Sequence, residues 1–111
     1  MKPKETSLFL ALLRELQKIN TEFPLQYAIC LVEIASDEGL SLTTLSQRTG
    51  MPLSTTSRIV GALSIKRQKG EPYGLVDVKI VAAEKRKKAL FLTLKGKILI
   101  QNINDLLLQN T

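Results

Sequence analysis

The sequence predicts an α+β fold class, mainly helical with one small β-hairpin, and three observations lead to this prediction. Apolar residues recur at helical spacing in five separate segments of the chain. The segment 75–81 is rich in β-branched residues and partly alternates apolar with polar side chains, a pattern typical of a strand. Positive charge gathers around that strand. The 111 residues have the length of one domain, since independently folding units run to roughly 100 to 200 residues.

The first predicted helix covers residues 7–20, with Thr6 or Ser7 available as its N-cap. Its apolar surface is wider than one packed face needs, because Leu8 and Leu10 fall outside the main stripe. This excess indicates a second contact beyond the chain's own core. The inward stripe is predicted to consist of Phe9, Leu12, Leu13, Leu16 and Ile19.

A second helix is predicted over residues 25–37, where Pro24 suits the first turn and Gly39 stops the helix. Its apolar residues, Cys30 among them, lie at helical spacing. Because Cys30 has no partner cysteine in the chain, it cannot form an internal disulfide. We interpret it as a small hydrophobic core residue in preference to a reactive thiol.

Residues 41–67 form a predicted helix-turn-helix. Ser41 can cap a short helix that ends at Gly50, where glycine tolerates the left-handed backbone of a tight turn. A further helix, 53–67, follows. Its predicted inward face consists of Thr56, Ile59, Val60 and Leu63, and its outward face of Ser54, Ser57, Arg58 and Gly61.

A basic β-hairpin is predicted over residues 75–92, after the turn residues 70–74. The segment 89–92 is the expected partner of strand 75–81. Between the two strands, the tip carries four consecutive cations: Lys85, Arg86, Lys87 and Lys88. Thr93 can then cap a last helix that runs to about residue 109, with Leu99, Ile103 and Leu106 on its inward stripe.

The net charge of +6 conceals an uneven distribution along the chain. Residues 1–47 carry four basic and six acidic side chains, whereas residues 48–97 carry twelve basic and three acidic ones, a net charge of +9. The chain has no histidine and one cysteine, so the common zinc sites, Ser-His-Asp triads and Cys-His dyads cannot be built. We therefore expect no enzyme, no metal and no cofactor, in a soluble cytoplasmic protein without a membrane span.

A helix-turn-helix followed by a basic hairpin is a winged helix, and its exposed residues suit double-stranded DNA. The major groove, about 12 Å wide, admits a helix whose outer side chains are short and polar. Arg is preferred for insertion into a minor groove, which favours Arg86 at the hairpin tip. Glu84 could orient Arg86 or be merely solvated. The predicted DNA-binding residues are Ser54, Thr55, Ser57, Arg58, Lys66, Arg67, Lys85, Arg86, Lys87 and Lys88, and Lys95 and Lys97 would add phosphate contacts.

Three segments, in this order and spacing, resemble MarR-type winged-helix regulators. Residues 45–63 resemble the helix-turn-helix of that family, and residues 84–96 are similar to its wing signature, which leads into Leu92-Thr93-Leu94-Lys95-Gly96. Residues 24–31 resemble its second helix. The resemblance implies one winged-helix domain over 1–111 that binds the major groove through helix 53–67 and the minor groove through Arg86.

The resemblance also implies a homodimer built from the segments 1–22 and 94–111, in agreement with their surplus apolar surface. The predicted dimer residues are Leu8, Leu10, Ile100, Leu107 and Leu108. We therefore expect a sequence-specific transcriptional repressor. The alternative is an architectural or assembly module that uses the same fold without strong sequence preference. The sequence identifies neither the operator nor a small-molecule effector.

Overall fold

The computed structural model describes residues 4–65, 71–82 and 87–109. Within these ranges the chain has five helices and one two-stranded antiparallel sheet, which confirms the predicted α+β class. The elements in chain order are α1 (Lys4–Gln17), α2 (Leu25–Ser36), α3 (Leu42–Thr49), α4 (Leu53–Leu63), β1 (Val76–Ala82), β2 (Lys87–Leu92) and α5 (Leu94–Gln109).

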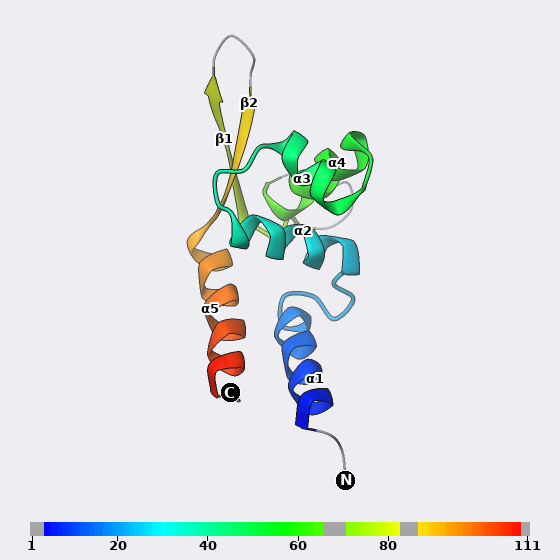
Figure 1. Cartoon of the computed structure of the whole chain (residues 1–111), viewed down its shortest axis with the longest axis vertical. Helices are drawn as coiled ribbons and strands as arrows, with labels where there is room; N and C mark the ends of the chain where they lie inside the picture. Colours follow the sequence, from blue (N-terminus) through cyan, green and yellow to red (C-terminus); the bar gives the residue numbers. More distant parts are fainter. Residues whose placement is uncertain (1–3, 66–70, 83–86, 110–111) are drawn as a thin grey trace.

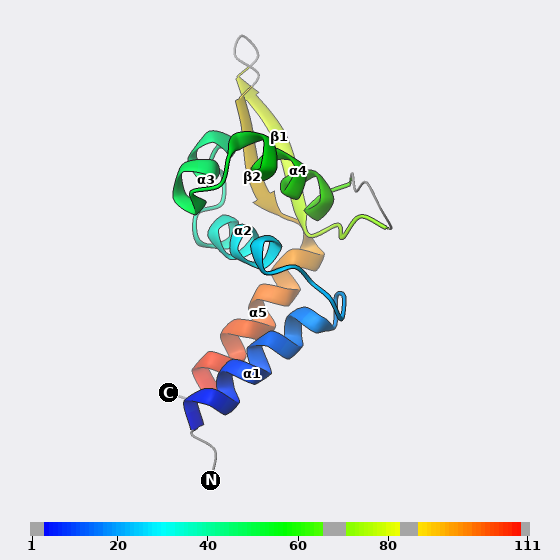
Figure 2. The same ribbon diagram turned by 90° about the vertical axis from the view of Figure 1, so that its right-hand side faces the viewer.

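The elements divide into two regions along the longest dimension of the molecule, which is 57 Å. Helices α2, α3 and α4 pack together with the β1–β2 hairpin, which extends away from them at one end (Figure 1); we call this region the body. Helices α1 and α5 lie side by side at the opposite end, together with both termini (Figures 1 and 2); we call this pair the stalk. The helix-turn-helix and the hairpin therefore occupy one end of the molecule.

A continuous hydrophobic core holds the body together. Its side chains come from all three helices of the body and from the hairpin, and burial of each large one contributes about 1.5 to 3 kcal/mol. Cys30 belongs to this core, and burial, followed by the nearby charge of Glu33, raises the pKa of its thiol to about 11. The prediction of Cys30 as a core residue is thus confirmed. Fully buried members include Leu31, Ile34, Leu45, Ile59, Leu63, Leu75 and Leu90.

The caps predicted for α3 and α5, and the predicted turn after α3, are confirmed. Ser41 caps α3, because its Oγ accepts a hydrogen bond from the Thr44 amide at 3.0 Å. Gly50 ends α3 in the left-handed region, with φ of 73°. Thr93 caps α5, since its Oγ1 accepts a hydrogen bond from the Gly96 amide at 3.1 Å. These local signals set the ends of two helices as the sequence indicates.

Helix α4 ends at Leu63, so the prediction that it extends to residue 67 is wrong. Ser64 leaves the helical conformation, with φ of −93° and ψ of −105°. The last helical carbonyls, which have no partner within a helix, accept hydrogen bonds from the amides of residues 73–75 instead. The returning chain thus terminates the helix four residues earlier than the local pattern predicts.

The two strands are displaced towards the hairpin tip relative to the prediction. β1 begins at Val76 instead of Leu75, and β2 begins at Lys87 instead of Ala89. A third segment pairs with the other edge of β2: the Gly39 amide donates to the Leu90 carbonyl at 2.7 Å. The loop between α2 and α3 thereby ties the hairpin to the helix-turn-helix.

The stalk is far less buried than the body. Helix α1 begins at Lys4, ahead of the predicted caps at Thr6 and Ser7, and none of its residues is buried. The prediction of its inward stripe is partly wrong, because Phe9 and Leu13 are exposed while Leu8 is half-buried. The less exposed apolar positions of this segment are Leu8, Leu12, Leu16 and Ile19.

No helix among the residues described above is long and apolar enough to cross a membrane.

Candidate nucleic-acid interface

The turn between α3 and α4 is fixed by local hydrogen bonds. The amide of Gly50 donates to the Ser46 carbonyl at 3.0 Å, and the Ser46 hydroxyl donates to the Met51 carbonyl at 2.7 Å. Ser46 thereby spans the turn from the end of one helix to the approach of the next. The sequence did not reveal this role of Ser46, although a small polar residue four positions before a turn glycine is a signal for it.

Helix α4 has one face in the core and one in solvent. Thr56 is fully buried, and its Oγ1 donates to the Pro52 carbonyl at 3.0 Å, so its hydroxyl is satisfied within the helix. Ser54, Ser57 and Arg58 are exposed, as predicted, and Thr55 is half-buried. The exposed face of α4 thus consists mainly of short polar side chains around one long cation.

The hairpin displays its cations along the strands. Lys87 pairs with Ala82 and Lys88 with Ile80 in the antiparallel register, and both lysines are exposed. The prediction that they belong to the tip is wrong, because they form the first two positions of β2. Lys79 lies on β1, with its Nζ 4.9 Å from the centre of the Phe91 ring. The described part of the hairpin near its tip therefore exposes lysines beside the apolar side chains of Ile80 and Val81.

Several predicted contacts lie outside the described residues. They are Lys66 and Arg67 beyond α4, and Glu84, Lys85 and Arg86 at the hairpin tip.

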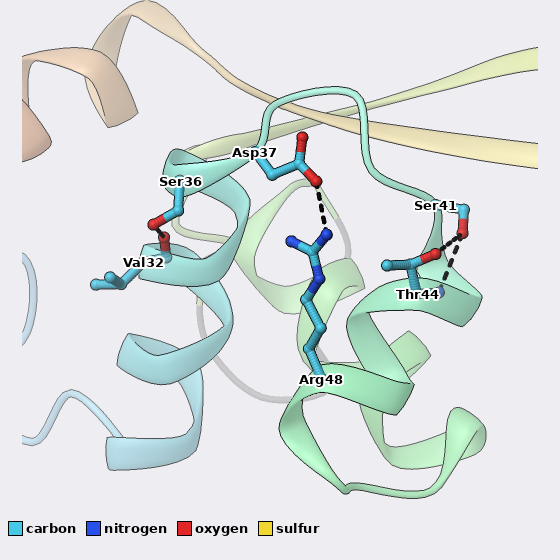
Figure 3. Close-up of polar contacts among 6 residues, drawn as sticks. All are labelled: Val32, Ser36, Asp37, Ser41, Thr44 and Arg48. Atoms are coloured by element: carbon cyan, nitrogen blue, oxygen red, sulfur yellow. Dashed lines mark hydrogen bonds and ion pairs between the residues drawn. The ribbon is translucent and has the colours of Figure 1, made fainter.

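Two other cations of the basic segment bond to groups of the same chain. Arg48 on α3 forms an ion pair with Asp37 at the end of α2, with Nη2 and Oδ2 2.8 Å apart (Figure 3). The Nζ of Lys95 donates to the Tyr73 carbonyl at 2.9 Å. The expectation that Lys95 serves as a phosphate contact does not match this geometry, since its ammonium bonds to the backbone.

The predicted dimer residues fall into two groups. Leu10, Leu107 and Leu108 are exposed, Leu108 by 70%. Leu8 and Ile100 are half-buried, and Ile100 packs against the chain's own core, which does not fit its predicted place on an outer surface. The exposed apolar surface of α1 includes Phe9 and Leu13 in addition to Leu10. Phe9 was missed because periodicity alone could not orient a helix that is apolar on several sides.

A cavity of about 330 Å³ lies between the two helices of the stalk. Its walls are mainly apolar, with charged side chains contributed by both helices. It is lined by Glu15, Lys18, Ile19, Leu94, Lys95, Ile98, Leu99 and Asn102.

Comparison with known proteins identifies similar segments and similar folds. Residues 34–65 match the family model of the IclR helix-turn-helix domain. This range covers α3, α4 and the end of α2, less than half of the chain. No curated protein matches the chain.

Three of the similar solved structures are described as transcriptional regulators or repressors. The PcaV regulator from Streptomyces coelicolor, in complex with its natural ligand, is 21% identical with a TM-score of 0.61 over 80% of this chain. A MarR transcriptional regulator from Methanosarcina mazei Go1 is 19% identical with a TM-score of 0.62 over 95% of this chain and 72% of its own. The repressor CouR, bound to a 23-mer DNA duplex, is 18% identical with a TM-score of 0.64 over 96% of this chain and 68% of its own.

These similarities establish a winged-helix fold. The match spans 58% of the length of the PcaV structure. The sequence match is to an IclR-type segment, whereas the fold matches named above include a MarR regulator.

Proposed function

We propose that the chain is a homodimeric, sequence-specific, double-stranded DNA-binding transcriptional repressor of the MarR type. The observation that carries the proposal is the two-sided helix α4. Its inner face is fixed by Thr56, Ile59 and Leu63 in the core, and its outer face presents Ser54, Ser57 and Arg58 beside a basic hairpin. A rigid helix with short outer side chains can approach base edges closely.

Each part of this surface has a proposed role. Arg58 would donate two hydrogen bonds to one guanine, a contact that discriminates by about 1 to 3 kcal/mol. Ser54, Thr55 and Ser57 would contact the groove around it, and Arg86 would enter the minor groove. The remaining cations would contact phosphates and set the register of the protein on the duplex: Lys66, Arg67, Lys85, Lys87 and Lys88.

The fold of CouR, bound to a DNA duplex, supports a DNA partner for this chain. The basic segment 48–97, with its net charge of +9, supports the same partner, because phosphate neutralisation dominates protein–DNA affinity. One cation of this segment, Arg48, forms an ion pair with Asp37 of the same chain. We propose no catalytic activity, no cofactor, and a cytoplasmic site of action.

The dimer is proposed to form through the stalk. Phe9, Leu10 and Leu13 on α1, with Leu107 and Leu108 on α5, are exposed apolar side chains that a second copy would cover. Two copies related by two-fold symmetry would place their α4 helices in successive major grooves, about 10 base pairs apart.

Selection from random duplexes, with the solution mass measured beside it, tests this function. We expect a dimer and a two-fold symmetric motif with half-sites about 10 base pairs apart. The Arg58→Ala variant should lose base preference at one position of each half-site. Lys88→Ala should weaken binding to all duplexes alike and reduce the salt slope by about one.

The matched control is Arg14→Ala, which removes an exposed cation from α1 and should leave both readouts unchanged. Unaltered affinity and preference in a double Arg58, Arg86 alanine variant would overturn the proposal. A monomer that selects no motif would instead support the architectural module.

A further inference from the structure

Residues 73–75, which we call the junction, bond to the end of α4 through their amides. The junction lies outside the helices and strands, and Gly74 within it has a positive φ of 66°. The amides of Tyr73 and Leu75 take the last two carbonyls of α4, and the Gly74 amide takes that of Ser64, the residue after the helix. The hydrogen bonds run from Tyr73 to Ala62 at 3.0 Å, from Gly74 to Ser64 at 3.0 Å, and from Leu75 to Leu63 at 2.7 Å.

The same three residues bond to the start of α5 through their carbonyls. The Tyr73 carbonyl accepts from Lys95 Nζ at 2.9 Å, and the Gly74 carbonyl accepts from Thr93 Oγ1 at 2.7 Å. The Leu75 carbonyl accepts from the Thr93 amide at 3.0 Å. The junction is therefore held on one side by α4 and on the other by α5.

Close packing adds to this connection. A Cβ on Gly96 would overlap the backbone carbonyl of Leu75, so α5 meets the junction at a distance that only glycine permits. The Tyr73 hydroxyl also accepts a hydrogen bond from Asn20 Nδ2 at 2.9 Å, and its ring packs edge-on against Phe23. The segment between α1 and α2 is thus anchored to the junction through Tyr73.

Among the junction hydrogen bonds described above, the one from Lys95 is made by a long, charged side chain. Thr93 binds through its backbone and a short hydroxyl, as part of the helix cap. The bond from Lys95 is charge-assisted and stronger than a neutral hydrogen bond, and it attaches α5 one residue further back along the junction. Two attachment points separated along α5 restrict rotation of the helix about the junction, which a single cap would allow.

We propose that Lys95 is a positioning residue that fixes the angle between α4 and α5 and thereby sets the spacing of the two half-sites. Helix α5 is bonded to the junction at its start and forms one half of the stalk (Figure 1). If copies associate through the stalk, a change in the angle between α4 and α5 alters the distance between the two α4 helices. The inference rests on the proposed DNA-binding function and its dimer.

The experiment compares duplexes that carry the selected half-sites at different spacings. Starting from the preferred spacing of about 10 base pairs, one or two base pairs are added or removed, and affinity is measured over a range of salt concentrations. The test variant is Lys95→Met, which keeps the apolar arm but removes the donor. The matched control is Lys97→Met, which removes an exposed cation two residues along the same helix.

The wild-type chain should prefer one spacing by about tenfold or more, because each added base pair turns one half-site by roughly 35° about the duplex axis. K95M should bind all spacings within about threefold of one another and keep the wild-type salt slope. K97M should retain the spacing preference. Lys95→Arg, which restores a charged donor, should recover the preference.

A K95M chain that keeps the spacing preference overturns the inference. If its salt slope also falls by about one, Lys95 is a phosphate contact. If only its melting temperature falls, Lys95 contributes to stability alone. If K95M is unfolded at the assay temperature, Lys95→Gln takes its place, since its shorter arm leaves the Tyr73 carbonyl out of reach, and the same results decide. A wild-type chain that selects a single half-site contradicts this inference and the proposed dimer, but leaves sequence-specific DNA binding standing. One that selects no motif contradicts the proposed function as well.

Discussion

Helices α4 and α1 are both amphipathic, but they have very different surroundings. Five of the eleven residues of α4 are buried, whereas none of the fourteen residues of α1 is. Helix α4 packs against α2 and α3 and is bonded to the junction, whereas the main neighbour of α1 is α5. Apolar periodicity therefore marks surface that needs a partner, and the number of neighbouring elements decides whether that partner lies within the same chain.

The largest expected effect is the loss of stability when a substitution creates a cavity in the core of the body. Leu63→Ala removes a fully buried side chain from α4 and should lower the free energy of unfolding by about 2 to 5 kcal/mol. The matched control is Leu25→Ala on α2, where the side chain is 72% exposed and the change should stay within about 0.5 kcal/mol. Urea denaturation measures both. Equal losses for the two variants would contradict the difference in burial.

Reactivity of Cys30 should follow unfolding of the body. Because burial raises the thiol pKa from 9.0 to about 11, the thiolate fraction at pH 8 falls about a hundredfold, and alkylation by iodoacetamide should slow at least as much relative to the unfolded chain. Between pH 9 and 11 the unfolded thiol ionises while the folded thiol stays protonated, so rising pH should reduce stability in that window. Cys30→Ala should lack this component, and rapid alkylation of the folded chain would show that the thiol is accessible.

A smaller effect is expected from the stalk. Phe9→Gln removes an apolar side chain that is 61% exposed, so the folded chain itself should lose little stability. If a second copy covers Phe9, the dissociation constant of the dimer should rise by about tenfold or more, as for aromatic side chains at other interfaces. Analytical ultracentrifugation measures it. A Thr21→Ala variant, which alters an exposed polar residue after α1, serves as the control, and an unchanged dissociation constant for F9Q would exclude α1 from the dimer.

The smallest effect should come from the ion pair between Arg48 and Asp37. Both side chains are about half exposed, so Asp37→Asn should cost no more than about 1 kcal/mol, and high salt should remove the difference from wild type. Thermal unfolding at two salt concentrations tests the contribution, and a loss that persists at high salt would assign a different role to Asp37.

The sequence predicted those features that depend on neighbouring residues. Ser41, Gly50 and Thr93 end or begin helices through contacts within a few positions, and a pattern of capping residues reveals them. The two faces of α4 were likewise predicted, because Thr56 and Arg58 differ in polarity and in helical position. The outer residues of the proposed site were therefore accessible to sequence reasoning.

The features that the sequence did not predict depend on distant parts of the chain. Helix α4 ends at Leu63 because amides ten or more residues later take its final carbonyls. Lys95 resembles a surface cation until the position of the Tyr73 carbonyl is known. The orientation of α1 depends on α5, about ninety residues away in the sequence, so local periodicity could not choose between Leu8 and Phe9 as the inner residue.

The pairing of the α2–α3 loop with β2 also bears on how the chain resists aggregation. An open strand edge offers unpaired amides and carbonyls to other chains. Here the outer edge of β2 is closed: the Leu90 amide donates to Leu40, and the Leu92 amide donates to a Glu38 carboxylate oxygen at 2.8 Å. The edge of the sheet that stays unpaired is that of β1, where the charged side chains of Asp77 and Lys79 are exposed. On the described part of the hairpin, the edge of β1 therefore stays open to another strand, with the apolar Ile80 and Val81 exposed beside these charges.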